Sequence, residues 1–575
     1  MVRNVNKICF VFLILLLFIW GSSKSIAMPP YPDLDKQVQL GNIPLPKCIA
    51  RPQLAKEMGI DQPVLHPKSG VYPKGTGATG SYKALVLLVN FSDNASTVNA
   101  SFFDTLIFAN QSYCLRHYYR EVSYGTLDIV TVNLPSSTGW LTDPQTYSYY
   151  VDGKYGMDGT YPHNSQKLVE DLVDLADPVV DFSDYDNDGD GYVDALIVVH
   201  AGPGAEYTGS PDDIWSHSWS VPWSWSVSNL KDGVHIFSYT IQPEYWIHAY
   251  DMTCGVFCHE LGHNFGLPDL YDYGYDSYGL GKWSLMAYGC WNGNLGNSPA
   301  YPDPYCMVQL GYVTPLVVSS NITGVKIPAI EHSPTIYKLW TSGAPGSEYF
   351  LLANSQKAGY DSYLPSSGLL IWHVDGSISD EGANDHQWYP GYEAYGHYKV
   401  ALEQSDGLWQ LEKNTSPGNP GDPYPGNPIQ RTFDGTTTPN SNSYAGAATY
   451  VVVTNISNSK DTMTCDIFVS PADVKDDYTQ ESPSDYQLEQ NYPNPFNPQT
   501  EIKYHIPKGG LVLLEVFNAL GEKVQTLVDR IQEKGDYLVN WDGTNVQGES
   551  VANGMYFYRL NTNDYIRTNK MLLLK

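Results

Sequence analysis

The feature that most constrains this chain is the segment CHELGHNFGLPDLYD, which runs from Cys258 to Asp272. Its histidines, His259 and His263, are four residues apart, so a helix would present both imidazoles on one face, one turn apart. Two nitrogens placed in this way converge on a zinc ion at about 2.0–2.1 Å. Gly266 lets the chain leave the helix through a left-handed conformation, and Asp269 can then return as a third ligand.

The residue beside the first histidine, Glu260, is placed to handle a water next to the metal rather than to bind the metal. Three protein ligands with one open position form a catalytic zinc site, whereas structural sites are closed. Asp272 follows Asp269 by three residues and is an alternative third ligand. The spacing therefore predicts zinc on His259, His263 and Asp269, with Glu260 as the general base for a water at the metal.

A second element, WSLMAY, follows at Trp283–Tyr288 after a Gly-rich loop. Met286 can supply an apolar floor beneath the two imidazoles. A bare HExxH segment arises by composition in about one to a few per cent of chains of this length. A chance copy would not be expected to carry the glycine, the aspartate and the methionine turn as well, which favours a genuine metal site.

These residues resemble a known family. HELGHNFGLPD followed by SLMAY is similar to the metzincin pattern of zinc endopeptidases, and the run from Ser81 to Ser470 resembles the immune inhibitor A-like secreted bacterial metallopeptidases. The resemblance implies an α+β metzincin-like catalytic domain, zinc as the cofactor, and protein or peptide substrates. Tyr288 stands where some metzincins place a tyrosine that binds zinc or the oxyanion, with a packed aromatic residue as the alternative.

The N-terminus predicts export. Arg3 and Lys7 precede an apolar run, Ile8–Trp20, and small residues follow at Ser25–Ala27, which is typical of a signal peptide over residues 1–27. The alternative is a membrane anchor, but the run of 13 residues is shorter than the ~20 needed to cross a bilayer. We therefore expect a secreted or cell-surface protein with no stable membrane span.

The charge balance restricts the partners. The chain has 33 Lys and Arg against 62 Asp and Glu, a formal net charge of −29. An acidic surface repels phosphate, so nucleic acid and anionic membranes are not expected to bind. Charged residues make up only 17% of the chain and hydrophobic residues 42%, which indicates folded domains rather than disorder.

The length of 575 residues exceeds what one core supports, and the patterning suggests several segments. We expect a prosegment at 28–80, the catalytic domain at 81–315, a β-sandwich at 316–470, an acidic linker at 471–485 and an Ig-like β-sandwich at 486–575. Within the catalytic domain the periodicity predicts strands and helices at Lys83–Phe91, Ser112–Val122, Thr126–Val132 and Ala195–Val199, and a helix capped near Asn164 with Leu168, Leu172 and Leu175 inward.

An acidic loop precedes the third of these strands. Asp186, Asp188, Asp190 and Asp194 match the first half of a calcium-binding loop, with Gly191 for the turn. Position 12 of an EF-hand would be Ile197, so the bidentate glutamate is missing. We therefore predict a single structural calcium ion here rather than an EF-hand, and a solvated turn without an ion is the alternative.

The cysteines and remaining histidines are less informative. Export to an oxidising compartment favours one or two disulfides among Cys254, Cys258, Cys290 and Cys306. Cys48, in the prosegment, is a candidate zinc ligand that would keep a precursor inactive, with a disulfide or a free thiol as alternatives. Four further histidines lack ligand spacing and are expected to be structural: His200, His217, His235 and His248.

The C-terminal segment has its own signature. NYPNPFNP at Asn491–Pro498, followed by GDYLVNWDG, VANGMYFYRL and KMLLLK, resembles the sorting domain of type IX secretion. The resemblance implies contact with secretion machinery and export across an outer membrane, and a plain Ig-like binding module is the alternative. For the whole chain the alternative to a peptidase is a surface adhesion or glycan-binding protein, against which the intact Glu260 argues.

Overall fold

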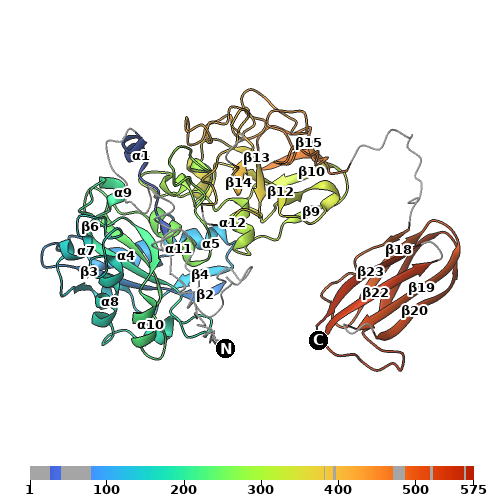
Figure 1. Cartoon of the computed structure of the whole chain (residues 1–575), viewed down its shortest axis with the longest axis horizontal. Coiled ribbons are helices and arrows are strands. Elements are labelled where there is room, and N and C mark those ends of the chain that lie inside the picture. The colour runs from blue at the N-terminus through green and yellow to red at the C-terminus, as the bar shows by residue number, and fades with distance from the viewer. Residues whose placement is uncertain are drawn as a thin grey trace, which may run out of the picture. The chain divides into compact units, whose positions relative to one another are not determined.

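The computed structural model describes residues 26–39, 79–380, 382–392, 396–470, 486–518, 522–562 and 565–574. The chain divides into two compact units, Met1–Pro471 and Ala472–Lys575. The predicted signal peptide up to residue 25, most of the predicted prosegment including Cys48, and the predicted linker lie outside the described residues. Figure 1 shows the first unit with a helix-rich part and a strand-rich part, and the second unit as strands alone.

The first part of unit 1 is built on a six-stranded sheet in the order β1-β7-β8-β6-β3-β5. Neighbouring strands among β5, β3, β6 and β8 are parallel, whereas β7 is antiparallel to β8 and β1 is antiparallel to β7. The sheet strands are β1 (Ile26–Ala27), β3 (Leu85–Asn90), β5 (Trp140–Thr142), β6 (Leu196–Pro203), β7 (His217–Ser220) and β8 (Ser238–Tyr245). The parallel strands β3 and β6 are buried on both faces, which explains their continuous apolar runs.

The predicted strands are present with changed ends. The run predicted as one strand from Lys83 is divided at Ala84, because β2 (Gly80–Lys83) pairs with β4 (Leu127–Val130) in a separate two-stranded sheet. The strand predicted over Ala195–Val199 continues to Pro203 as β6.

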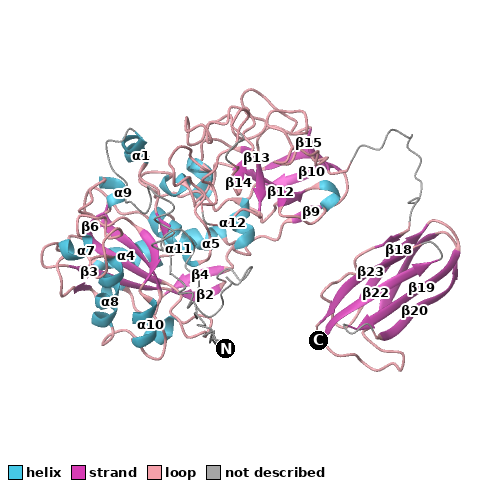
Figure 2. Ribbon diagram, in the orientation of Figure 1, coloured by secondary structure: helices cyan, strands magenta, loops and turns pink. Residues whose placement is uncertain are grey.

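Several helices lie against this sheet (Figures 1 and 2). The predicted helix over Ser112–Val122 begins only at Leu115. As expected, the Asn164 side chain caps the helix α8 (Ser165–Ala176) by accepting a hydrogen bond from Lys167 N at 3.3 Å. Leu175 is 36% exposed, contrary to prediction, because the buried stripe of α8 is centred on Val169, Leu172 and Ala176. The helices of unit 1 are α1 (Pro32–Gln39), α4 (Ala100–Phe108), α5 (Leu115–Val122), α6 (Pro135–Thr138), α7 (Tyr147–Val151), α8 (Ser165–Ala176), α9 (Ala205–Thr208), α10 (Trp223–Ser228), α11 (Cys254–Asn264) and α12 (Pro304–Gln309).

The second part of unit 1 contains a five-stranded sheet, β14-β13-β12-β11-β9, and a three-stranded sheet, β10-β16-β15. Side chains from both sheets, such as Phe350, Ile371 and Met463, belong to one apolar cluster, so the sheets pack on each other. The strands are β9 (Leu316–Val318), β10 (Ile322–Pro328), β11 (Tyr337–Leu339), β12 (Glu348–Ser355), β13 (Gly368–Asp375), β14 (Val400–Leu402), β15 (Val452–Thr454) and β16 (Thr462–Phe468). The described chain between β14 and β15 is loop (Figure 2).

Unit 2 has a three-stranded sheet, β17-β18-β21, and a four-stranded sheet, β20-β19-β22-β23. Their inner faces share one apolar core that includes Trp541 and Tyr558. The strands are β17 (Gln487–Leu488), β18 (Thr500–Ile506), β19 (Gly510–Asn518), β20 (Lys523–Gln532), β21 (Gly535–Trp541), β22 (Gly554–Thr562) and β23 (Ile566–Leu573). Inward and outward residues alternate along β18 and β22, as a half-buried antiparallel sheet requires.

The expected disulfides are absent from the described part of the chain. All six described cysteines are buried free thiols: Cys114, Cys254, Cys258, Cys290, Cys306 and Cys465. Cys254 and Cys258 lie one turn apart on α11 and fill core positions, where a thiol behaves as a small apolar group. Burial raises the pKa of the Cys258 thiol well above its ordinary value, so this residue is neutral.

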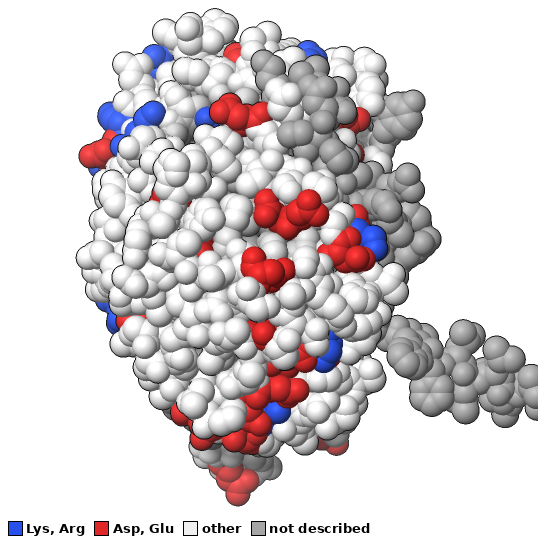
Figure 3. Space-filling view, turned by 90° about the vertical axis from the view of Figure 1, so that its left-hand side faces the viewer, with Lys and Arg blue, Asp and Glu red and all other residues white. Residues whose placement is uncertain are grey.

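The surface carries the charge that the composition predicts. Figure 3 shows carboxylates in several clusters on the face of unit 1 that it displays, with few lysines and arginines beside them. No helix within the described ranges is both long and apolar enough to cross a membrane.

Candidate metal centre

Helix α11 ends as the sequence predicts. It runs from Cys254 to Asn264, and Gly266 has a φ of 89°, a conformation that side-chain-bearing residues rarely adopt. Leu267 N donates to Gly262 O at 3.1 Å, which closes the helix terminus and turns the chain back toward the helix face. Asp269 follows two residues later and is 3% exposed.

Three acceptor atoms meet at the face of α11. His259 Nε2 and His263 Nε2 are 3.2 Å apart, and Asp269 Oδ1 lies 3.1 Å from the first and 3.4 Å from the second. Ligand atoms about 2.0–2.1 Å from a shared ion at tetrahedral angles are about 3.3–3.4 Å from each other. The separations in this structure therefore fit one zinc ion.

The other ring nitrogens determine what these atoms can be. His259 Nδ1 lies 2.9 Å from Leu285 O, and His263 Nδ1 lies 2.8 Å from Leu267 O. A carbonyl only accepts, so each Nδ1 carries a proton, and in a ring with that single proton Nε2 presents a bare lone pair. Burial lowers the pKa of His259, which favours that neutral form. Two lone pairs and a carboxylate oxygen at such distances repel each other unless a cation lies between them.

The methionine turn supports the same helix. A β-carbon added at Gly262 would lie 2.8 Å from Met286 Sδ, so the thioether packs directly against the turn between the two histidines. Leu270 N also donates to Met286 O at 2.7 Å, which ties the chain after Asp269 to the same turn. Met286 is fully buried, as expected for a floor beneath the site.

Glu260 is fully buried, and no side chain among the described residues donates a hydrogen bond to its carboxylate oxygens, although the Met28 backbone N–H is close enough to act on them. Burial raises the pKa of Glu260 well above its usual range, the carboxylates of Asp269 and Glu206 act in the same direction, and the Met28 backbone N–H opposes them. A buried carboxylate with open oxygens destabilises a fold, so its presence favours a chemical role over a structural one.

Of the two candidate third ligands, Asp269 lies with the histidines and Asp272 does not. The Asp272 oxygens accept from Gly274 N and Ser277 Oγ, each at 2.6 Å, within their own loop. Asp272 is absent from the cluster of ligand atoms that His259, His263 and Asp269 form.

One residue of the site was not predicted from the sequence. Tyr273 donates its hydroxyl proton to Asp269 Oδ2 at 2.7 Å, which orients the carboxylate and leaves Oδ1 directed at the histidines. Tyr288 is 2% exposed, with its ring 6.3 Å from that of Tyr271 and 5.4 Å from that of Tyr278. Those ring contacts fit the packed-aromatic alternative and do not identify a catalytic role.

An extended segment lies along the edge strand beside the centre. β1 pairs with β7 in the register Ala27 to His217, and Met28 N continues the ladder by donating to Ser216 O at 3.1 Å. The indole of Trp215 donates to Met28 O at 2.7 Å, and that of Trp291 donates to Pro29 O at 3.0 Å. Residues 26–28 thus pair along the β7 edge of the sheet, with Met28 next to Glu260.

The acidic loop gathers only part of its predicted set. Asp186, Asp188 and Asp190 place one oxygen each within 4.8 Å of one another, and Asp186 accepts backbone N–H groups from Gly189, Asp190 and Gly191. Asp194 is not in this cluster; it accepts from Asn187 N at 2.5 Å. Burial raises the pKa of Asp194 to about 7, because its carboxylate lies in the interior at the base of the loop.

Two of the other histidines have clear structural positions. His200 and His217 are fully buried, with Nδ1 of each close to a backbone carbonyl, at 2.9 Å and 2.7 Å respectively. Burial lowers the pKa of both to about 4, so they remain neutral.

The residues that form this site lie in a segment that matches a known protein family. Residues 72–305 match the family described as immune inhibitor A peptidase M6, catalytic domain. The matched segment includes Glu260 and all three residues whose ligand atoms converge.

Two curated proteins are similar to this chain over a stretch of similar length. The chain is 30% identical to Immune inhibitor A of Bacillus thuringiensis subsp. alesti over 273 residues, which is 39% of this chain and 38% of that protein. It is 27% identical to the Pre-pro-metalloprotease PrtV of Vibrio cholerae serotype O1 over 283 residues, which is 40% of this chain and 30% of that protein. The chain thus matches only about a third of the length of these relatives.

The C-terminal unit matches a different family. Residues 508–564 match the FlgD Ig-like domain, in agreement with the predicted Ig-like β-sandwich. Among solved structures, dimeric latent PorU of Porphyromonas gingivalis is 17% identical, with a TM-score of 0.15 over 22% of this chain and 12% of that chain. A likeness at that level carries no argument.

Proposed function

We propose that this chain is a secreted zinc-dependent endopeptidase that hydrolyses peptide bonds in proteins. The observation that carries the proposal is the meeting of His259 Nε2, His263 Nε2 and Asp269 Oδ1 at 3.1–3.4 Å beside the buried Glu260. The similarity of residues 72–305 to metallopeptidases supports it independently.

The chemistry follows from the residues of this chain. A zinc ion held by the three ligands would supply Lewis acidity toward a peptide carbonyl. Glu260 accepts the proton of the attacking water on a carboxylate oxygen and delivers it to the nitrogen of the leaving amine. The apolar surroundings that raise its pKa make it a stronger base and, once protonated, a competent acid. Tyr288 is proposed as a hydrogen-bond donor to the carbonyl oxygen during attack.

Metal content and hydrolysis test this assignment together. Glu260→Ala should retain zinc and fold but lose casein hydrolysis, and undiminished proteolysis would refute the general-base role. Asp269→Ala should lose zinc, whereas Asp272→Asn serves as the matched control and should retain it, since the Asp272 oxygens are engaged within their own loop. Zinc loss in the Asp272 variant alone would assign the third ligand to that residue instead.

The N-terminal segment fits the predicted prosegment. An extended polypeptide substrate would add to the edge of β7 by main-chain hydrogen bonds, and residues 26–28 lie along that edge. Ile26 and Ala27 end the predicted signal peptide, so only the part from Met28 onward belongs to the predicted prosegment. We infer that this segment covers the site and must move before substrate enters.

We also propose a structural calcium ion bound by Asp186, Asp188 and Asp190. The carboxylate of Asp194 adds a negative charge at the base of the same loop. The backbone N–H groups that converge on Asp186 hold the loop in a compact turn with its carboxylates directed together. Calorimetric titration of the metal-free protein with Ca²⁺ would test the proposal, and absence of heat at millimolar Ca²⁺ would contradict it.

Export is the remaining part of the proposal. Residues 1–27 would act as the signal peptide, and unit 2 would act as a type IX sorting domain that contacts secretion machinery at the outer membrane. The FlgD Ig-like match and the motifs of the C-terminal segment support it. Deletion of residues 486–575 should retain the protein in the periplasm, and unchanged export would contradict the sorting role.

A further inference from the structure

A cavity of about 150 Å³ opens in the second part of unit 1, separate from the metal centre. Its wall includes the rings of Trp388, Trp409 and Tyr444, the carboxylate of Glu403, and His373. We call it the aromatic pocket. A smaller depression shares Trp388, Glu403, Trp409 and Tyr444 with it, so the same side chains line adjoining spaces.

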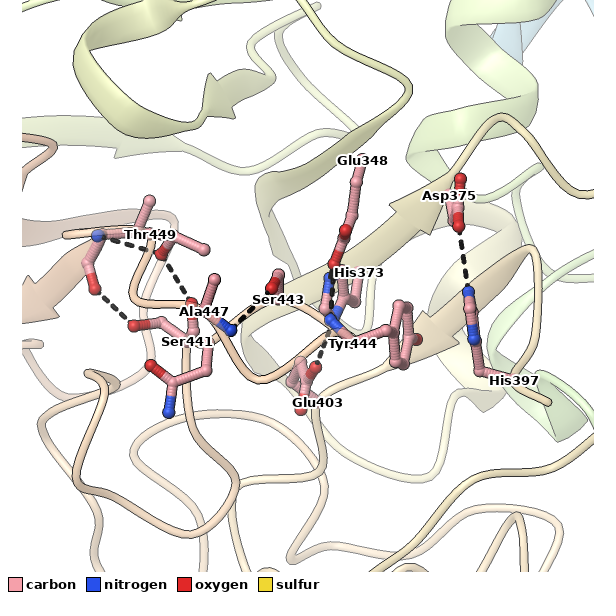
Figure 4. A network of polar contacts seen from close by, with 12 residues as sticks. Glu348, His373, Asp375, His397, Glu403, Ser441, Ser443, Tyr444, Ala447 and Thr449 are labelled. Carbon is pink, nitrogen blue, oxygen red and sulfur yellow. Dashed lines mark hydrogen bonds and ion pairs between the residues drawn. The ribbon is translucent and has the colours of Figure 1, made fainter. Parts of the chain in front are cut away.

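A charged triad borders the pocket: Glu403 and His373 line it, and Glu348, which does not line it, lies beside His373. His373 Nε2 lies 3.0 Å from Glu348 Oε1, and His373 Nδ1 lies 3.1 Å from Glu403 Oε1 (Figure 4). Carboxylate oxygens only accept, so both ring nitrogens donate and the imidazole is an imidazolium. Burial lowers the pKa of His373, but its hydrogen bonds to Glu348 and Glu403 outweigh burial and raise it. Two carboxylates around one imidazolium leave one negative charge uncompensated.

The position of Tyr444 is determined by stacking. Its ring lies 4.0 Å from that of His373 and 3.6 Å from that of His397, and both pairs are nearly parallel. His397 in turn bonds Asp375 Oδ2 at 3.0 Å (Figure 4). Because two imidazoles stack on Tyr444, the ring surface left to a ligand comes chiefly from the two tryptophans.

Trp409 already attracts a cation. Lys413 Nζ lies 5.5 Å from its ring centroid and 5.2 Å from that of Tyr389. Trp409 also has a φ of 51°, a left-handed conformation that is unfavourable for a residue with a side chain of this size. The fold thus holds this indole in a strained conformation at the pocket wall.

The loops that carry the tryptophans also contact the segment that follows Asp269. Gln387, next to Trp388, donates to Asp276 Oδ1 at 3.1 Å, and Tyr278 N donates to Leu411 O at 2.9 Å. The pocket is therefore built on chain that packs against the loop of the metal centre.

We propose that the aromatic pocket binds the basic side chain of a lysine or arginine in a polypeptide, with its cationic group over the tryptophan rings and beside Glu403. Aromatic faces next to a carboxylate attract cations, and a neutral saccharide would leave the charge uncompensated. That the polypeptide is a substrate rests on the proposed peptidase function, whereas the preference for a cation rests on the pocket alone.

The test is a binding titration on full-length protein carrying Glu260→Ala, so that no peptide is cleaved. The probes are acetyl-Gly-Lys-Gly-amide and the same peptide with norleucine in place of lysine, followed by tryptophan fluorescence and calorimetry. We expect the lysine peptide to bind at least about tenfold more tightly than the norleucine peptide. Equal affinities, or no binding of the lysine peptide, would overturn the proposal without any variant.

Variants locate the binding. Trp409→Ala and the isosteric Glu403→Gln should each weaken lysine-peptide binding by about tenfold. Trp223→Ala is the control, since that indole is 40% exposed and lies elsewhere in unit 1. Unchanged binding in Trp409→Ala, or Trp409-dependent binding of chitotriose with none of the lysine peptide, would refute a cation pocket. Casein hydrolysis by the protein with Glu260 intact is measured separately, so failure of the peptidase assignment remains distinguishable.

Discussion

Replacing Tyr273 with phenylalanine should weaken zinc binding without unfolding the protein. The hydroxyl donates to Asp269 Oδ2 at 2.7 Å, and both groups are buried, so the variant removes one charge-assisted hydrogen bond and little volume. Such a bond contributes about 1.5–3 kcal/mol, and every ~1.4 kcal/mol is tenfold in affinity. We therefore expect the zinc dissociation constant to rise by about 10- to 100-fold, in line with losses of outer ligand partners elsewhere.

The assay is competition for zinc between the protein and a chelating dye, with the melting temperature recorded on the same samples. Tyr312→Phe provides the matched control, since its buried hydroxyl has no hydrogen-bond partner among the described residues. The control should keep the affinity of the parent protein. A zinc dissociation constant for Tyr273→Phe within about twofold of the parent value would refute the idea that this tyrosine orients the ligand.

Three other predictions follow from the structure. Burial raises the pKa of Asp194 to about 7, so the folded chain holds a proton on this carboxyl that the unfolded chain releases above about pH 4. The free energy of unfolding therefore falls as pH rises through about 7, by up to about 4 kcal/mol. Ca²⁺ should raise the melting temperature more near pH 8, where Asp194 is ionised, than near pH 5. A calcium effect independent of pH would contradict this. Gly262→Ala should lower stability by about 1–3 kcal/mol, because the new methyl group would meet Met286 Sδ, and a denaturant midpoint equal to that of the parent would be inconsistent with the packing. Protein that begins after residue 31 should hydrolyse peptides faster than protein that begins at Met28, and equal rates would show that residues 28–31 do not obstruct the site.

Local patterns predicted the parts of this protein that depend on near neighbours. The spacing of His259 and His263 places both on one face of α11, and Gly266 ends the helix with a positive φ, because helix geometry relates residues a few positions apart. Asn164 caps α8 for the same reason. The prediction of disulfides was wrong for the described cysteines, because cysteine spacing does not reveal whether two thiols face each other or fill separate core positions.

Contacts between distant segments required the tertiary structure. Tyr273 reaches Asp269 through the shape of a loop, and residues 26–28 pair with residues 216–218 at the edge of the sheet. Glu348, His373 and Glu403 meet from three strands or strand ends. The sequence by itself determined which side chains a helix or a turn brings together. Only the tertiary structure decided which carboxylates lie at the metal centre, which border the aromatic pocket and which have a raised pKa, because burial and charge pairing depend on segments far apart in the chain.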